Sequence, residues 1–493
     1  MIRVGLARTD ATYAGLRPPY GPGRAYPELR DLLGSGAADG PPNPVYAGVR
    51  AALRGLGLDA SRFGGPDWNP LGALVERGAR VVLKPNFIRH YNPVADGSVE
   101  SVITHGAVVR AVADYAALAV GTEGSVTIAE APQQDCDFER IRELAGLDAL
   151  VDFYAATLGR ELEVIDLRTE AVDRRDGVIV SRRALPGDPR GYRTVDLGPH
   201  SFFEGSGLEP SRYRGADYDP GPTVEHHRDG RNEYLLSETV LSADLVVNLP
   251  KLKCHKKTGV TLALKNLVGI NGDKNWLPHH TLGSTAEGGD EYPGSGALDR
   301  LRSQLIERAR GILRRGRGAA FFRGVRRLET AVRGDAFVRS GNWHGNRTTW
   351  RMCLDLNRCL YYSDAAGLHL DAPAPVRTVL SVMDAIVGGE GQGPLAPRDV
   401  PVGAVLAATD PVALDLVAIR LMGFAEDRIP KVREAMRDTG PRVTAVRAPD
   451  DVCVLEVAAA SFEARERSLD EIVCERPFEP HSGWFGHVER RVA

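Results

Sequence analysis

Short apolar runs alternate with longer amphipathic segments along the chain, and this pattern predicts an α/β fold. Strands are expected at IRVGLA near the start, VVLKPNF at 81–87, SVTIAEA at 125–131, LEVIDL at 162–167 and DLVVNLP at 244–250. Between them, GAVVRAVADYAALAV has the apolar spacing of a helix. The alternation predicts mixed or parallel sheets flanked by helices.

The same rhythm returns after about residue 350. RTVLSVMDAIVGGEG reads as a strand that enters a glycine loop, VGAVLAATD as a strand, DPVALDLVAIRLMGF as a helix and DVCVLEV as a last strand. Thr409 or Asp410 can cap that helix, and Pro411 occupies a first-turn position, where its missing N–H costs nothing.

These segments predict two α/β lobes with a central cleft. Residues 1–74 form an irregular N-terminal wrap with the first strand, and 75–290 form the first lobe. That lobe contains a small β-rich or irregular insertion at about 170–235, where short strand candidates alternate with polar loops. Residues 291–345 are an arginine-rich helical insertion, and 346–493 form the second lobe.

Composition narrows the class of protein. The chain is 43% hydrophobic and 26% charged, with a formal net charge of −3, which argues against general nucleic-acid binding. The six cysteines show no CxxC spacing, so neither a zinc ribbon nor an iron–sulfur cluster is expected. No apolar run is long enough to span a bilayer, and the N-terminus lacks a signal-peptide layout. We therefore expect a cytoplasmic protein.

The segment 244–280 carries the densest polar chemistry. Its buried strand runs directly into Lys251, Lys253 and His255, which share one side of an extended segment. Thr258 can cap a following helix, which would direct backbone N–H groups into the site, and Lys265 and Asn266 lie near its far end. Because parallel sheets place ligands at the carboxyl ends of their strands, we expect an anion site here. The alternative is an exposed basic loop.

A second polar group ends the strand VVLKPNF. Lys84 and Asn86 emerge together there, and an ammonium beside an amide suits a carboxylate or phosphate oxygen. Alternatively, Lys84 pairs with an acid such as Glu130, and Asn86 caps a turn. His105, at a helix start, is either a third member of this group or a structural cap.

A divalent metal is a further hypothesis. His279 and His280 follow the WLP turn, and Asp273 could complete a site with His255. Adjacent histidines point to opposite sides, so at most one of the pair would serve a given ion. Mixed His and carboxylate donors favour zinc, manganese or iron over calcium.

Acidic and aromatic candidates come later in the chain. Asp384 and Glu390 flank a GGEGQG loop, where a carboxylate can bind a cation, orient a hydroxyl or act as a base. No strand–glycine–helix unit with a ribose-binding acid is present, which excludes a Rossmann dinucleotide site. In GNWHGNRTTW, Asn342 is a substrate-binding candidate, and the tryptophans either stack on a ligand or join the lobes.

The segment 300–333 contains eleven arginines and only two acids. It is either an arm that contacts a polyanion or an anionic membrane surface, or a solvated helix face paired with acids elsewhere in the fold.

Several motifs together resemble the domain-of-unknown-function family 362 (DUF362), in its long form without a ferredoxin domain. They are VVLKPNF, LPKLKCHKKTGVTLALKNLVGINGDKNWLPHH, SGNWHGNRTTWRMCLDLNR and MDAIVGGEGQGPLAP followed by ATDPVALDLVA, within about 75–425. The resemblance implies a family without an established reaction. The strand–loop pattern DLVVNLPKLKCHKKTGVTLALKN is also similar to that of the nickel-dependent lactate racemases.

From these residues we expect an enzyme that acts on an anionic or polyhydroxylated small molecule by acid/base or metal-assisted chemistry. Lys84, Lys253 and Lys265 would hold the anion, while His255 and Glu390 are acid/base candidates and Lys265 is a further catalytic candidate. One alternative is a racemase or epimerase. Another is a non-catalytic protein that binds an anion or polyanion.

Overall fold

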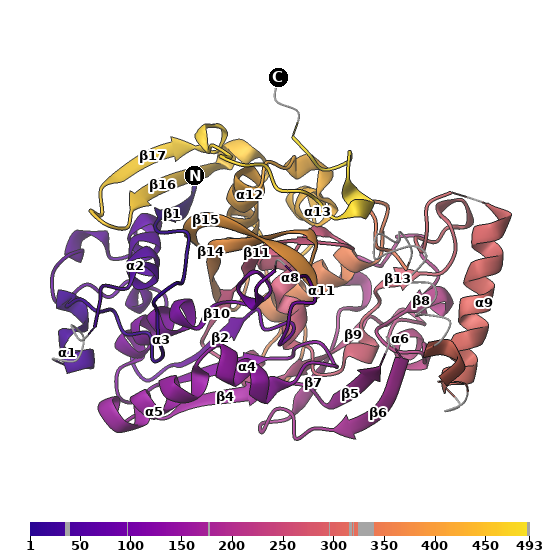
Figure 1. Ribbon diagram of the computed structural model, residues 1–493, viewed down its shortest axis with the longest axis horizontal. Helices are drawn as coiled ribbons and strands as arrows, with labels where there is room; N and C mark the ends of the chain where they lie inside the picture. The colour runs from indigo at the N-terminus through magenta and orange to yellow at the C-terminus, as the bar shows by residue number, and fades with distance from the viewer. Residues whose placement is uncertain are drawn as a thin grey trace.

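A computed structural model describes residues 1–34, 40–95, 97–175, 178–294, 296–314, 318, 320–323 and 340–490. These residues build a large mixed sheet with helices on both faces, which confirms the α/β class (Figure 1). The predicted strands and helices recur at nearly the predicted positions.

The central sheet is continuous across the chain. Its order is β17 (Ala464–Ser468), β16 (Val452–Ala458), β1 (Ile2–Arg8), β15 (Ala396–Ala408), β14 (Thr378–Gln392), β10 (Leu245–Leu249), β2 (Arg80–Pro85), β3 (Ser125–Glu130) and β4 (Leu162–Asp166). Strands β14, β10, β2, β3 and β4 are parallel neighbours. The carboxyl ends of β10, β2 and β3 therefore lie at one edge.

The strands predicted for two separate lobes belong to this one sheet. The link is β10 against β14, where Val246 lies opposite Val379. The chain then passes Pro250 into β11 (Lys251–His255), which continues alongside β14 and also pairs with β12 (Gly259–Val260). The two halves are joined by backbone hydrogen bonds, which local sequence periodicity cannot reveal.

Alternation along the strands gives each face of the sheet its own core. Leu245 and Val247 pack with the layer that contains α2 (Pro44–Leu56), α3 (Gly106–Val120) and α5 (Leu147–Leu158). Val246 faces the layer that contains α8 (Leu262–Asn266), α11 (Thr349–Tyr362), α12 (Pro411–Leu421) and α13 (Pro430–Arg437). With both faces covered, these strands are apolar throughout.

The insertion predicted at 170–235 is built from small two-stranded sheets. They pair β5 (Glu170–Arg175) with β6 (Val178–Ala184), β7 (Tyr192–Asp196) with β9 (Glu233–Ser237), and β8 (Tyr213–Arg214) with β13 (His280–Thr281). The remaining short helices are α1 (Arg30–Leu33), α4 (Phe138–Leu144), α6 (Gly221–Glu225) and α7 (Glu238–Leu241).

The described part of the arginine-rich segment contains α9 (Ala297–Arg314), at the end of the molecule farthest from α1 and α2 (Figure 1). Its arginines meet acids: Arg300 lies 2.8 Å from Glu287, and Arg314 lies 3.0 Å from Asp219. These pairs neutralise part of the charge of α9 and leave both expectations for the segment open, and its residues 315–317, 319 and 324–333 lie outside the described part of the chain. No described helix is long and apolar enough to cross a membrane.

Candidate functional site

Lysine is used sparingly in this chain, and its placement marks the site. The sequence contains eight lysines, whereas the other 54 of its 62 basic residues are arginines. None of the eight is exposed; they are Lys84, Lys251, Lys253, Lys256, Lys257, Lys265, Lys274 and Lys431. Lysine is ordinarily a surface residue, so the absence of exposed lysines indicates that their compact ammonium groups have specific roles inside the protein.

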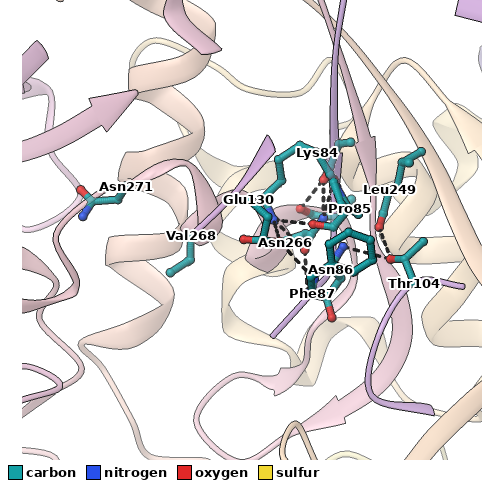
Figure 2. A network of polar contacts seen from close by, with 12 residues as sticks. Lys84, Pro85, Asn86, Phe87, Thr104, Glu130, Leu249, Asn266, Val268 and Asn271 are labelled. Carbon is teal, nitrogen blue, oxygen red and sulfur yellow. Dashed lines mark hydrogen bonds and ion pairs between the residues drawn. The ribbon is translucent and has the colours of Figure 1, made fainter. Parts of the chain in front are cut away.

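Lys84, at the carboxyl end of β2, forms a buried ion pair. Its Nζ lies 2.6 Å from an oxygen of Glu130, which ends the neighbouring strand β3. The ammonium also donates to Asn266 Oδ1 at 3.1 Å and to the Pro85 carbonyl at 2.8 Å (Figure 2). With three acceptors it has no donor left over for a ligand. The pairing with Glu130 that the sequence offered as an alternative is confirmed.

Asn266, near the end of α8, ties this ion pair to the neighbouring strands. Its Oδ1 also accepts from Asn86 Nδ2 at 2.7 Å (Figure 2). Its Nδ2 donates to Asn248 Oδ1 at 2.7 Å. Asn86 is thereby oriented, and its own Oδ1 accepts from Lys253 Nζ at 2.6 Å. The two asparagines therefore position the lysines.

Lys253 is fully buried, yet it has only neutral partners. Its ammonium donates to Asn86 Oδ1 and to the Val102 carbonyl, and it pairs with no carboxylate among the described residues. Burial, reinforced by the nearby charges of Lys251 and Lys265, lowers its pKa well below the ordinary lysine value. Protonation of Lys253 is therefore less favourable than that of an exposed lysine.

Lys265 and His255 complete a basic group without an acid. The Lys265 ammonium makes no hydrogen bond or ion pair within the described chain, and burial lowers its pKa. His255 accepts from the Lys257 backbone N–H through Nδ1 at 3.0 Å. Burial and then the charge of Lys265 hold its pKa well below 6.5, so the ring is neutral and carries its proton on Nε2.

A second buried pair lies beside this group. Lys251 Nζ is 2.9 Å from Asp384, whose other oxygen accepts a short bond from the Tyr13 hydroxyl. The oxygen that faces Lys251, Oδ2, also accepts from the backbone N–H of His105. Asp384 is thus a fully engaged internal partner. Predicted as a substrate ligand, it holds Lys251 instead.

His105 caps α3, as one of its two interpretations predicted. Its Nδ1 accepts from the Ala107 N–H at 3.1 Å, and its ring stacks on Tyr13 with centroids 4.0 Å apart. Burial lowers its pKa to about 4, so it stays neutral.

Glu390 is buried, and both of its oxygens are occupied. One oxygen lies 2.7 Å from Arg476, and the other accepts from the Glu479 backbone N–H at 2.9 Å. This carboxylate fastens the C-terminal segment to β14 and is not free to act as a base. The prediction that its loop meets the lysine strand does hold, because Lys253 pairs with Gly389; the contact is strand pairing and not a cleft.

The predicted metal ligands do not gather. The described residues contain no group of three or more His, Cys, Asp or Glu side chains placed to hold a metal ion. Asp273 caps a short turn of helix by accepting from Asn275 N, and His279 contacts the Leu277 carbonyl. His280 is buried without a hydrogen-bond partner. The four donors thus have separate local surroundings.

Thr258 differs from expectation, whereas the substrate-binding role predicted for Asn342 stays a prediction. The helix begins at Leu262, so Thr258 does not cap it and donates to the Val260 carbonyl instead. The first N–H groups of α8 are taken by Asp415, at 2.7 Å from Ala263 N, so they are not available to an anion. Asn342 lies just before α11, and its side-chain oxygen is buried without a partner.

Some contributors were missed from the sequence. Tyr13 comes from the N-terminal wrap, and Lys431 on α13 lies 2.7 Å from Asp415, which holds the start of α8. The sequence does contain a signal for the lysine, because lysines are so scarce and six of the eight fall within 251–274. No local signal identifies Tyr13.

Comparison with known proteins identifies one region. Residues 196–420 match the model of the family described as "Domain of unknown function (DUF362)", which confirms the family expectation for this part of the chain. The strand end that carries Lys84 lies outside the match. No curated protein and no solved structure matches the chain.

Gly269 packs directly against the Lys84–Glu130 pair, so Gly269→Ala tests the network. An added Cβ would lie 1.8 Å from a Glu130 oxygen and 2.5 Å from Lys84 Nζ. Separating a buried pair costs about 3–5 kcal/mol, and we expect a loss of that order in the free energy of unfolding. Urea unfolding measures it. Gly311→Ala, in open space on α9, is the control and should not destabilise.

From the lowered pKa of Lys274, we expect the free energy of unfolding to rise with pH. Burial lowers its pKa to about 7 from 10.5. Between these two values the unfolded chain binds more protons than the folded one, so the free energy of unfolding should increase with pH by up to about 1.4 kcal/mol per unit. Unfolding of Lys274→Met at pH 7, 8 and 9 should show a shallower rise. If the free energy of unfolding of Lys274→Met rises with pH as steeply as that of the unmutated protein, the lowered pKa of Lys274 is contradicted. Arg62→Met, at an exposed position, is the control.

Proposed function

Taking as premise that residues 196–420 belong to the DUF362 family, we propose that this protein is a cytoplasmic enzyme acting on an anionic small molecule by acid/base chemistry. One observation supports the proposal above all others. Lys253, His255 and Lys265 influence one another electrostatically, and none of them pairs with a carboxylate in the described structure.

The charge balance supports an anionic ligand. Three lysines have their own carboxylates: Lys84 with Glu130, Lys251 with Asp384, and Lys431 with Asp415. Lys253 and Lys265 pair with no carboxylate of the described residues, and an unpaired buried charge is costly unless it loses its proton or gains a partner. A ligand carboxylate or phosphate would supply that partner and return the proton to the amine.

The same group can move protons. Burial lowers the pKa of Lys265, so its ammonium, once a bound anion has restored the proton, can donate that proton to the ligand as a general acid. His255, neutral with its proton on Nε2, can donate a hydrogen bond to an oxygen where negative charge develops. Glu390 takes no part in this version of the mechanism.

Two alternatives belong to other classes. The racemase or epimerase alternative needs a base that removes the α-proton, and the described residues contain no clustered metal ligands to support it. In the non-catalytic alternative, the lysines hold the anion and no bond changes. The alternatives differ in what His255 does once the anion is bound.

Anion binding should weaken as pH rises, because the lysines must be protonated to hold the ligand. We expect calorimetry with malonate to show tighter binding at pH 6 than at pH 9. Runs in two buffers with different ionisation heats should show proton uptake. Lys265→Met should weaken binding about tenfold or more, whereas Lys265→Arg should keep binding but lose part of the pH dependence. Equal affinity for all three proteins would remove Lys265 from the site.

A substitution at His255 distinguishes a catalytic protein from one that only binds an anion. In D2O, NMR of L-lactate with the protein tests exchange of the α-proton, which the racemase alternative requires. His255→Gln should abolish any exchange while malonate affinity changes little. If a panel of hydroxy and keto acids binds and none reacts, the non-catalytic alternative is favoured.

The partner proposed for the arginine-rich segment is an anionic membrane surface or polyanion. Leu301 and Leu305 on α9 are each 53% exposed, beside a dense set of arginines. We expect the protein to sediment with vesicles of 30% phosphatidylserine, and Leu301→Ser with Leu305→Ser to reduce the bound fraction. Arg62→Gln serves as the control. Equal sedimentation with neutral vesicles would contradict an electrostatic contribution.

A further inference from the structure

Residues of the GNWHGNRTTWR motif from His344 to Arg351 line a surface hollow. Two adjoining hollows of about 560 and 280 Å³ share His344, Pro430 and Arg433. Their walls come from the segment leading into α11, from the start of α13 and from the C-terminal segment at His487. Segments far apart in the sequence therefore meet around one opening.

Cations outnumber acids in this wall. The arginines are Arg347, Arg351, Arg428 and Arg433, and the acids are Asp427 and Glu434. Glu434 is already held by Arg433 at 2.7 Å and is also approached by Arg437. Arg347, Arg351 and Arg428 pair with no carboxylate in the described part of the chain. The hollow therefore has an excess of positive charge.

The polar atoms already bound to these arginines are backbone carbonyls. Arg351 donates through Nε to the Phe202 carbonyl at 3.0 Å, and its guanidinium lies 4.2 Å above the Trp350 ring. Burial and then the charge of Arg347 lower its pKa to about 10. Arg347 donates to the Ser206 carbonyl at 3.0 Å. Neutral acceptors orient these groups without cancelling their charge.

Two histidines complete the wall. The rings of His344 and His487 stack, with centroids 3.4 Å apart. His344 is fixed by its backbone N–H, which donates to the Gly483 carbonyl at 3.0 Å. Stacked imidazoles add further N–H donors at the rim.

We propose that this hollow is an anion-binding site for the phosphate group of a small phosphorylated molecule, separate from the lysine group. Several guanidinium forks around one space match the oxygens of a phosphate, which accepts from more than one direction. The volume leaves room for the rest of a small molecule beside that group. A polycarboxylate shares part of this chemistry, and the experiment distinguishes the two.

Helix α13 shows why the two sites are distinct. Lys431 is fully buried and faces Asp415 in the interior, whereas the side chain of Arg433 on the same helix is 34% exposed. The helix thus separates an inward ammonium from an outward guanidinium. A ligand in the hollow reaches the arginines without entering the lysine group.

Calorimetry with pyrophosphate on the full chain tests the proposal, with citrate as the polycarboxylate. We expect the double variant Arg347→Gln, Arg428→Gln to weaken pyrophosphate binding by about tenfold or more. Arg437→Gln, whose side chain is 69% exposed on the same helix but outside the hollow, should bind as the unmutated protein does. Equal melting temperatures confirm that the double variant is folded.

Variants of the lysine group and a second ligand show whether pyrophosphate binds in the hollow. Lys265→Met should leave pyrophosphate binding at the hollow intact, so failure of the lysine proposal does not remove this site. If Lys265→Met abolishes pyrophosphate binding while the double variant retains it, the hollow is not the site. Tighter binding of citrate than of pyrophosphate would overturn the phosphate assignment. If Arg428→Glu binds as tightly as the unmutated protein, the arginine site is rejected.

Discussion

The buried ion pair between Lys84 and Glu130 is the constraint on which the candidate site depends. It joins the ends of β2 and β3, and Asn266 connects it to α8 and β10. An uncompensated charge at this depth costs several kcal/mol, so the pair and its amide partners must form together. These contacts orient Asn86 so that its side chain accepts from Lys253. The buried ion pair therefore fixes the position of the lysine that we propose binds the ligand.

Arginine and lysine side chains have different roles in this protein. Arginines lie at the surface, around the hollow beside α13 and also in the interior, where Arg110 and Arg168 are buried; their planar, permanently charged forks bind carboxylates and carbonyl oxygens. Lysines serve the interior, where a compact amine can lose its proton when no anion is present. Lys253 and Lys265 represent this second use, since neither pairs with a carboxylate in the part of the chain that the structure describes.

Much of the framework follows from local sequence alone. The periodicity predicted the helix at 106–120 and the strand at 244–250, and Asp410 with Pro411 announced the start of α12. The pairing of Lys84 with Glu130 was an explicit alternative, because both residues end apolar strands. Roles set by distant partners were not predictable. Glu390 looked reactive in its glycine loop, yet Arg476, far along the chain, occupies it.

The sequence by itself determined the α/β class, the family match of residues 196–420 and the stretch of chain in which the chemistry gathers, because periodicity, capping and motif spacing are local properties. Tertiary structure decided which basic groups stay unpaired, because that depends on contacts across hundreds of residues. Tyr13 reaches Asp384, and β11 lies along β14 in one sheet where two lobes were expected. Hydrogen bonds and burial set these outcomes only after the chain has folded.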